Sequence, residues 1–322
     1  MTVQDWMKDT SRNFRRNGLV DGTRHTAKNS LHSVLSRIDP HVGGWNIYDD
    51  EWDLLIVLDA CRADLLAEIS DEFNFLPSEP QTRRSLGTAT RNWMQRTFTE
   101  RYAGEMSDTS YVVANAYSEL LLDPSDFEYM DEVHRYAWDD EFGTVRPRPV
   151  TERAIDIYRN RDPQRLLVHY LPPHFPSIPD HLGYNMQREN FEKSNGEDGI
   201  EWNSVWDALS QGEVSSERVW SAYRENLRYV LDDVRVLLNN VNAERAIITS
   251  DHGNAFGEWW TYGHPPGVYV PVNRRVPFVE VTASDQKTLE PTLENRSNRT
   301  APDRDQESSD DVNDRLAALG YK

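Results

Sequence analysis

The chain has 322 residues, and its 35 basic and 54 acidic side chains give a formal net charge of −19, with 38% hydrophobic and 11% aromatic residues. This size and composition suit one large globular domain or two small ones and exclude a disordered chain. No apolar run approaches the roughly 20 residues of a membrane span, and the N-terminus lacks the apolar core of a secretory signal. The single cysteine excludes an internal disulfide. The acidic surplus argues against nucleic-acid binding. We therefore expect a soluble, cytoplasmic protein.

The first predicted element is an N-terminal helical extension over residues 1–45. Residues 3–38 have the pattern of one or two amphipathic helices and form the one locally basic stretch of the chain. Its cationic residues are Arg12, Arg15, Arg16, Arg24 and Lys28. A solvated helix face is favoured over a surface that contacts an acidic partner or a membrane.

The main domain is predicted at residues 46–283, where strand and helix signals alternate. Strand signals lie at 53–58, 110–115, 165–171, 244–249 and 276–282, and helical patterns lie at 61–70, 88–99, 149–160 and 214–240. Several of the strands are continuous apolar runs, which are typical of strands buried on both faces of a parallel sheet. The alternation predicts an α/β fold with a mostly parallel central sheet and helices on both faces.

Two polar segments interrupt or follow this domain. Residues 180–212 have little periodicity and are predicted to be an insertion over the sheet edge. Residues 283–312 have few apolar side chains, so we expect the first part of the acidic tail at 284–322 to be flexible. The tail ends in DVNDRLAALGYK, which has the pattern of a short amphipathic helix that docks onto the domain.

The kind of charge is also informative. The chain has 5 Lys and therefore 30 Arg among its 35 basic residues. A carboxylate-rich, lysine-poor surface is favoured in a cytoplasm of very high salt, where the Debye length falls to roughly 3 Å at 1 M and self-repulsion is muted. The composition thus favours a halophilic source, with an ordinary acidic mesophilic protein as the alternative.

Acidic and imidazole side chains follow two of the predicted strands. The strand at 53–58 runs directly into Asp59, and the strand at 244–249 is followed by the sequence SDHG, which contains Asp251 and His252. Ligands of open α/β sheets bind at the carboxyl ends of the strands. A buried carboxylate needs a partner charge there, and carboxylate with imidazole suits a divalent cation. The alternatives are that Asp59 caps the following helix and that Asp251 and His252 belong to an ordinary turn.

Three histidines lie near the same predicted edge. His169 is within the strand at 165–171, where a core or edge histidine is expected. His174 lies in the proline-rich loop after that strand, and His264 lies in a loop framed by glycine and proline. Stiff loops hold functional side chains with little entropy to lose, so His174 and His264 are candidate substrate contacts. The alternative is that both are surface histidines.

A nucleophile is expected on a helix that starts at this edge. The segment RRSLGTATRNWMQRTF at residues 83–98 offers the hydroxyls of Ser85, Thr88 and Thr90. A hydroxyl at a helix N-terminus lies near backbone N–H groups, which also suit a phosphate or an oxyanion. A divalent cation lowers the pKa of an oxygen ligand, so such a hydroxyl is a feasible nucleophile. The alternative is that it serves only as the helix N-cap.

In chain order, these features resemble the alkaline phosphatase superfamily and most of all its sulfatase-like branch. The resemblance covers about residues 53–282, and the strand-end DHG sequence is its most specific part. It implies an alkaline-phosphatase-like fold with a nucleophile that opens a helix. It also implies that His174 and His264 contact the substrate or a second metal. The metal ligands that it implies are Asp59, Asp251 and His252.

The chain departs from this family in two motifs. Formylglycine sulfatases carry Cys or Ser followed by x-Pro-x-Arg, whereas residues 88–92 are TATRN, so a formylglycine sulfatase is not expected. A threonine nucleophile resembles the phosphodiesterase and phosphotransferase branches. Thr88 is preferred because Thr97 follows nine residues later, as a Thr or Ser often does in the family, and Thr90 is the alternative. The Asp-x-x-Gly-His signature of the two-zinc enzymes is absent, so both one and two metal ions are open.

The resemblance implies a metal-dependent hydrolase or transferase that acts on a phosphate or sulfate ester of a small molecule or glycan. Mixed Asp, His and Thr ligands favour Zn²⁺ or Mn²⁺ over Ca²⁺ or Mg²⁺. The alternative is an inactive relative that binds an anionic glycan or lipid headgroup, which the altered nucleophile motif favours and the retained metal ligands oppose. A cofactor-independent phosphosugar mutase would need a second large domain, for which residues 120–150 and 180–212 are too short.

Overall fold

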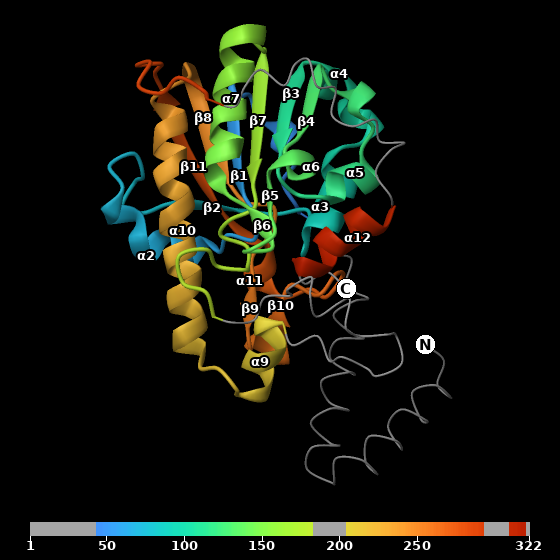
Figure 1. The fold of residues 1–322 in the computed structure, drawn as a ribbon, viewed down its shortest axis with the longest axis vertical. Helices are drawn as coiled ribbons and strands as arrows, with labels where there is room; N and C mark the ends of the chain where they lie inside the picture. Colours follow the sequence, from blue (N-terminus) through green and yellow to red (C-terminus); the bar gives the residue numbers. More distant parts are fainter. Residues whose placement is uncertain (1–42, 183–203, 293–308, 320–322) are drawn as a thin grey trace.

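The computed structural model describes residues 43–182, 204–292 and 309–319 (Figure 1). The strands are β1 (Leu54–Leu58), β2 (Gln81–Arg84), β3 (Thr109–Val113), β4 (Tyr129–Glu132), β5 (Trp138–Asp139), β6 (Thr144–Val145), β7 (Arg165–Tyr170), β8 (Ala243–Thr249), β9 (Ala255–Phe256), β10 (Tyr262–Gly263) and β11 (Arg275–Ala283). The α-helices are α2 (Ala63–Ile69), α3 (Thr90–Thr97), α4 (Ala103–Ser107), α5 (Tyr117–Leu121), α6 (His134–Ala137), α7 (Pro147–Arg161), α9 (Val205–Gln211), α10 (Ser216–Leu238), α11 (Pro271–Arg274) and α12 (Ser309–Ala318).

Seven of the strands form one sheet in the order β2-β11-β8-β1-β7-β3-β4. β1 is parallel to its neighbours β8 and β7, and β3 is parallel to β7 and β4. β11 is antiparallel to both β8 and β2. The carboxyl ends of β1, β3, β7 and β8 therefore lie at one edge of the sheet, and β2 ends there too because two antiparallel steps restore its direction. The predicted α/β fold with a mostly parallel sheet is confirmed.

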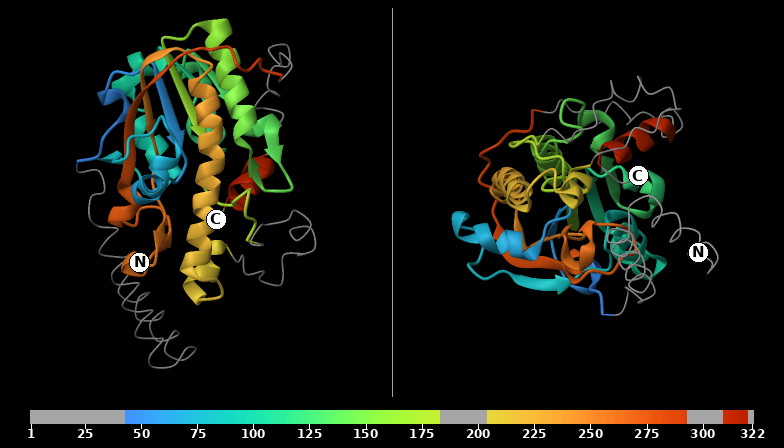
Figure 2. Two further views of the ribbon diagram at one scale, coloured as in Figure 1. Left: turned by 90° about the vertical axis from the view of Figure 1, so that its left-hand side faces the viewer. Right: turned by 90° about the horizontal axis from the view of Figure 1, so that it is seen from below.

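Helices cover both faces of this sheet (Figures 1 and 2). All five residues of β1 are buried. On one face, Leu54 and Ile56 pack in a hydrophobic cluster with α2, α7 and α10. On the other face, Leu55 and Val57 pack in a second cluster with α3, α4, α5 and α12. Because alternate side chains of a strand point to opposite faces, a strand between two helical layers must be apolar throughout.

Two strands of the sheet are missing from the sequence prediction. β2 has the sequence QTRR and its side chains are largely exposed, because it is an edge strand with no apolar face to bury. β4 lies at the opposite edge. The predicted strand at 276–282 forms as β11, but it runs antiparallel to its neighbours. β2 matters for function because the chain leaves it directly toward the candidate nucleophiles.

The polar segments are more structured than their composition predicts. Within the predicted insertion at 180–212, residues 205–211 form α9, which begins with a capping box between Ser204 and Asp207. Residues 284–292 were expected to be flexible, but they hydrogen-bond to the body of the domain; Asp285, for example, pairs with Arg159 of α7 at 2.9 Å. Composition does not show these backbone and ion-pair contacts.

The predicted C-terminal helix is present as α12, and its Val312 and Leu316 are buried in the second cluster. The helices predicted within residues 3–38, and residues 183–203 and 293–308 of the two polar segments, lie outside the described residues. Across the ranges that the structure describes, no helix is both long enough and apolar enough to cross a membrane.

Candidate metal centre

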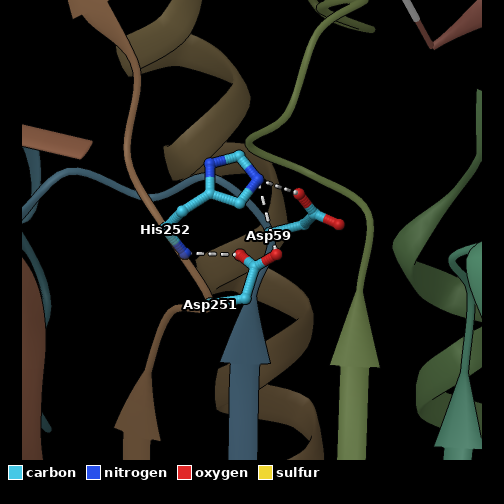
Figure 3. A group of neighbouring side chains, drawn as sticks. All are labelled: Asp59, Asp251 and His252. Atoms are coloured by element: carbon cyan, nitrogen blue, oxygen red, sulfur yellow. Dashed lines mark hydrogen bonds and ion pairs between the residues drawn. The ribbon is translucent and has the colours of Figure 1, made fainter. Parts of the chain in front are cut away.

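Two parallel neighbouring strands deliver three ligand-type side chains to one point. Asp59 follows β1, and Asp251 and His252 follow β8. One ligand atom from each of the three lies within 4.8 Å of the others, and all three residues are fully buried. Figure 3 shows the side chains directed toward one another beyond the ends of these strands.

The Asp59 carboxylate is held through one of its two oxygens. Asn115, which follows β3, donates from Nδ2 to Asp59 Oδ2 at 2.7 Å. His169 Nε2 of β7 lies 3.3 Å from the same oxygen, and His169 Nδ1 contacts the Tyr111 hydroxyl at 3.0 Å. The other oxygen, Oδ1, lies 3.7 Å from His252 Nε2. Asp59 therefore presents Oδ1 to the centre.

Asp251 is held in the same way. Its Oδ1 accepts the backbone N–H groups of Ala60 and His252, each at 2.9 Å. Its Oδ2 is buried, has no hydrogen-bond partner among the described residues and lies 3.4 Å from His252 Nε2. An unsatisfied carboxylate oxygen in a buried site is costly, so Oδ2 is a natural position for a cation.

Local contacts also fix the imidazole of His252. Its Nδ1 faces the carbonyl oxygen of Gly253 at 3.0 Å, which requires a proton on Nδ1 and leaves the Nε2 lone pair toward the two carboxylates. Metal-ligating histidines characteristically donate their other ring N–H to such a partner. Two carboxylate oxygens and one imidazole nitrogen are a donor set for a divalent cation, so the residues present fit the implied metal.

The candidate hydroxyls occupy different positions. Thr90 Oγ1 lies 3.2 Å from His252 Nε2 and 3.4 Å from both oxygens of Asp59. Thr88 Oγ1 instead accepts from Asn92 Nδ2 and from the Gly267 backbone N–H, both at 3.2 Å. Of the two predicted candidates, Thr90, the first residue of α3, lies at the centre, whereas the preferred Thr88 lies away from it.

The chain around Thr90 is rigidly placed. Asn92 Oδ1 accepts the backbone N–H groups of Thr88 and Ala89 at 2.9 and 3.0 Å, which closes the first turn of α3. Ser85, at the end of β2, donates its hydroxyl to the Asp251 carbonyl oxygen and accepts from Gly87 N–H at 3.0 Å. Ser85 thus supports the metal-site loop and does not face the centre as a nucleophile would.

His174 and His264 come together beside the centre. Their Nε2 atoms are 3.4 Å apart, and the His264 ring lies 4.5 Å, centroid to centroid, from that of His252. His174 is 1% exposed and His264 is 7% exposed, so neither is a surface histidine. On α10, Asn226 Nδ2 donates to the main-chain carbonyls of Pro173 and His174 at 3.2 and 3.1 Å, which anchors the His174 loop.

Burial and neighbouring charge shift the titration of these groups. Burial lowers the pKa of His174, and the charge of His252 acts in the same direction, although the Asp59 carboxylate opposes the shift. Burial, with the charges of His252 and His174, places the pKa of His264 well below its ordinary value. Burial alone would raise the pKa of the Asp59 carboxyl, but His169 and the other nearby imidazoles outweigh it and lower that pKa. Both His174 and His264 are therefore neutral near pH 7.

The sequence prediction missed several residues of the centre. His169 was expected to be a core or edge histidine; it is a core residue of β7, but it also contacts the Asp59 carboxylate. Asn115 was not singled out, although its position directly after a strand is the signal that identified Asp59 and Asp251. Asn254 was missed as well; it accepts from His264 Nδ1 at 2.6 Å. Only the partners in space show these roles.

No protein-family model matches the sequence, and no curated protein matches it significantly. Among solved structures, the soluble domain of lipooligosaccharide phosphoethanolamine transferase A from Neisseria meningitidis matches at 15% identity and a TM-score of 0.46, over 72% of this chain and 76% of that chain. The periplasmic domain of phosphoethanolamine transferase EptC from Campylobacter jejuni matches at 14% and 0.44, over 71% and 78%. The periplasmic domain of EptC from Escherichia coli, in a complex with Zn, matches at 12% and 0.41, over 74% and 75%.

All three TM-scores lie below 0.5. The function proposed below therefore rests on the residues of this chain.

Proposed function

We propose that the chain is a metal-dependent enzyme that hydrolyses or transfers a phosphate or sulfate ester group, with Thr90 as the nucleophile. The observation that supports this most directly is the position of Thr90 Oγ1, 3.2 Å from His252 Nε2 and 3.4 Å from the Asp59 oxygens. Thr90 Oγ1 thus lies where the Asp59 carboxylate meets the His252 imidazole, in the buried centre that also holds the unsatisfied Asp251 oxygen.

The residues of the centre divide the chemistry between them. Asp59, Asp251 and His252 would hold the cation. When bound, a divalent cation would neutralise the carboxylates and favour ionisation of a neighbouring hydroxyl. Thr90 Oγ1 attacks the phosphorus or sulfur of the ester, so that a bond to Thr90 forms as the bond to the leaving oxygen breaks. Water or an acceptor alcohol then releases the group from Thr90, which gives hydrolysis or transfer respectively.

The leaving oxygen must gain a proton in the first step. The facing Nε2 atoms of His174 and His264 are 3.4 Å apart and can hold one proton between them. The neutral pair takes up the proton that the Thr90 hydroxyl gives up as it attacks, and passes a proton to the leaving oxygen, so that the step balances. The same pair offers hydrogen-bonding partners to the non-bridging oxygens of the transferred group.

The test is turnover of chromogenic phosphate monoesters, phosphodiesters and sulfate esters by the full chain, in low and high salt, after chelation and readdition of Zn²⁺, Mn²⁺, Mg²⁺ or Ca²⁺. We expect activity that depends on one of these ions and a covalent adduct on Thr90 after acid quenching, detected by peptide mass. An adduct absent in Thr90→Ala would assign it to that residue. Metal binding without turnover of any ester class would instead support the inactive relative that binds an anionic headgroup.

A further inference from the structure

Beside His169 of β7, three further histidines lie at the centre with their rings next to one another, and His174, His252 and His264 are each held through Nδ1. The partner of His252 Nδ1 is the carbonyl oxygen of Gly253, and that of His174 Nδ1 is the carbonyl oxygen of Phe175. The partner of His264 Nδ1 is different, because it is a side chain: Asn254 Oδ1, at 2.6 Å. Among these three partners, only Asn254 can therefore be replaced without changing the main chain.

Asn254 is itself firmly positioned. It is fully buried and follows His252 by two residues. Its main-chain carbonyl accepts from Arg62 Nη1 at 2.9 Å, and the same nitrogen lies 2.7 Å from Glu258 Oε1. The Arg62 guanidinium also stacks over the Trp220 ring, 5.0 Å from its centroid. Arg62 thus ties the Asn254 main chain to the start of α2 and to the chain before β10.

The acceptor oxygen decides which nitrogen of His264 carries the proton. With Oδ1 against Nδ1, the proton must be on Nδ1, and the Nε2 lone pair then faces Nε2 of His174. Without that acceptor, a proton on Nδ1 would lose the hydrogen bond that Asn254 Oδ1 accepts. A proton on Nε2 could instead be donated to His174 Nε2, which would join the two rings and occupy both lone pairs.

We propose that Asn254 is a positioning residue that holds His264 in the tautomer protonated on Nδ1 and so keeps the Nε2 lone pairs of His174 and His264 available to the reaction. This deepens the proposed function, and its consequence for turnover rests on that function. The assignment of the His264 tautomer does not rest on the proposed function, because it concerns only the folded protein.

The first test is two-bond ¹H–¹⁵N correlation of histidine-labelled, metal-free full chain at pH 8.5, with the His264 signals assigned through His264→Gln. We expect His264 to carry its proton on Nδ1 in the parent protein and in Asn254→Asp, which retains an oxygen at this position. In Asn254→Leu, which is similar in size but has no acceptor, we expect the proton on Nε2. The proposal is overturned if the parent carries the proton on Nε2, or if Asn254→Leu leaves it on Nδ1.

The second test is turnover of the best ester with the metal bound. Replacing the partner of a metal-ligating histidine typically costs 10–100-fold, and we expect a loss of the same order here: kcat of Asn254→Leu should fall by roughly that factor, and Asn254→Asp should recover part of the loss. Asn240→Leu is the matched control, since Asn240 is equally buried but bonds to Val236 and Thr288 away from the centre. Equal kcat losses in Asn254→Leu and Asn240→Leu would overturn the positioning role.

The two failures can be distinguished. If the parent chain turns over no ester with any metal, the proposed function fails, and the tautomer measurement still decides the role of Asn254 toward His264. If turnover is present but the tautomer does not respond to Asn254→Leu, only the positioning role fails.

Discussion

His174 and His264 are 90 residues apart in the sequence, yet their Nε2 atoms lie 3.4 Å from each other. Both Nδ1 atoms face oxygen acceptors, so each ring directs a lone pair into the gap between them. Two lone pairs at this separation repel unless a proton or a cation lies between them. Two imidazolium rings at this separation would bring two N–H groups and two positive charges together, so the rings cannot both be protonated.

The stability of the metal-free protein should decrease below pH 6.5. Folding lowers the pKa of His174 and of His264 from an ordinary value of 6.5. Between that value and the folded pKa values, the unfolded chain binds more protons, so the free energy of unfolding falls as pH falls, by about 1.4 kcal/mol per pH unit for each proton. Urea unfolding at pH 5.5, 6.5 and 7.5 measures how the free energy of unfolding changes with pH. The double variant His174→Gln/His264→Gln should have a shallower slope, and an unchanged slope would contradict the prediction.

Removal of the Thr90 hydroxyl should abolish turnover. We expect Thr90→Ala to lower kcat by more than about 10³-fold, because a nucleophile and its activating groups act as one unit. Thr90→Ser retains the hydroxyl and should keep measurable activity. Thr88→Ala is the matched control: it loses only the contacts to Asn92 and Gly267, so its loss should be much smaller. A larger loss in Thr88→Ala than in Thr90→Ala would return the role to Thr88.

Asp251→Asn should separate metal binding from folding. The variant can still accept the Ala60 and His252 N–H groups through its oxygen, but it replaces the unsatisfied Oδ2 and removes one of two adjacent negative charges. In chelator, we expect it to unfold at a temperature equal to or above that of the parent. Zn²⁺ at 100 times its Kd should stabilise the parent by about 2.7 kcal/mol and the variant far less.

Differential scanning calorimetry with and without Zn²⁺ would measure this. Asp232→Asn removes an exposed charge on α10 and serves as the control, with a metal response equal to that of the parent. Equal stabilisation of parent and Asp251→Asn by Zn²⁺ would show that Asp251 is not a ligand.

Gly253→Ala should destabilise the loop that carries His252. A Cβ atom at this position would lie 2.5 Å from the Val272 carbonyl oxygen and 3.0 Å from Arg62 Cγ, so the main chain must shift. We expect a loss of about 1–3 kcal/mol in the free energy of unfolding, together with weaker metal binding. In Gly104→Ala of α4, a Cβ meets nothing within 4 Å, so a small gain is expected there from helix propensity. Comparable losses in both variants would exclude the close approach as the cause.

Local pattern was sufficient for much of the fold. The apolar runs at β1, β7 and β8 predict buried strands because a strand between two helical layers must be apolar on both faces. Local pattern did not predict β2, because an edge strand buries no apolar face. It also did not predict that β11 is antiparallel, because the direction of a strand depends on the path of the connection before it. Nor does local pattern show the contacts that residues 284–292 make with α7 and the end of α10.

The sequence by itself determined that Asp59, Asp251 and His252 lie at one edge, because parallel strands bring their carboxyl ends together whatever follows them. Only the tertiary structure decided that Thr90 faces the centre and Thr88 does not. That choice depends on the rotation of the first turn of α3, which Asn92 and the distant Gly267 N–H fix. The meeting of His174 with His264, and the proton positions that Asn254 imposes, likewise depend on partners far apart in the chain, and hydrogen bonds of this kind leave no periodic trace in a sequence.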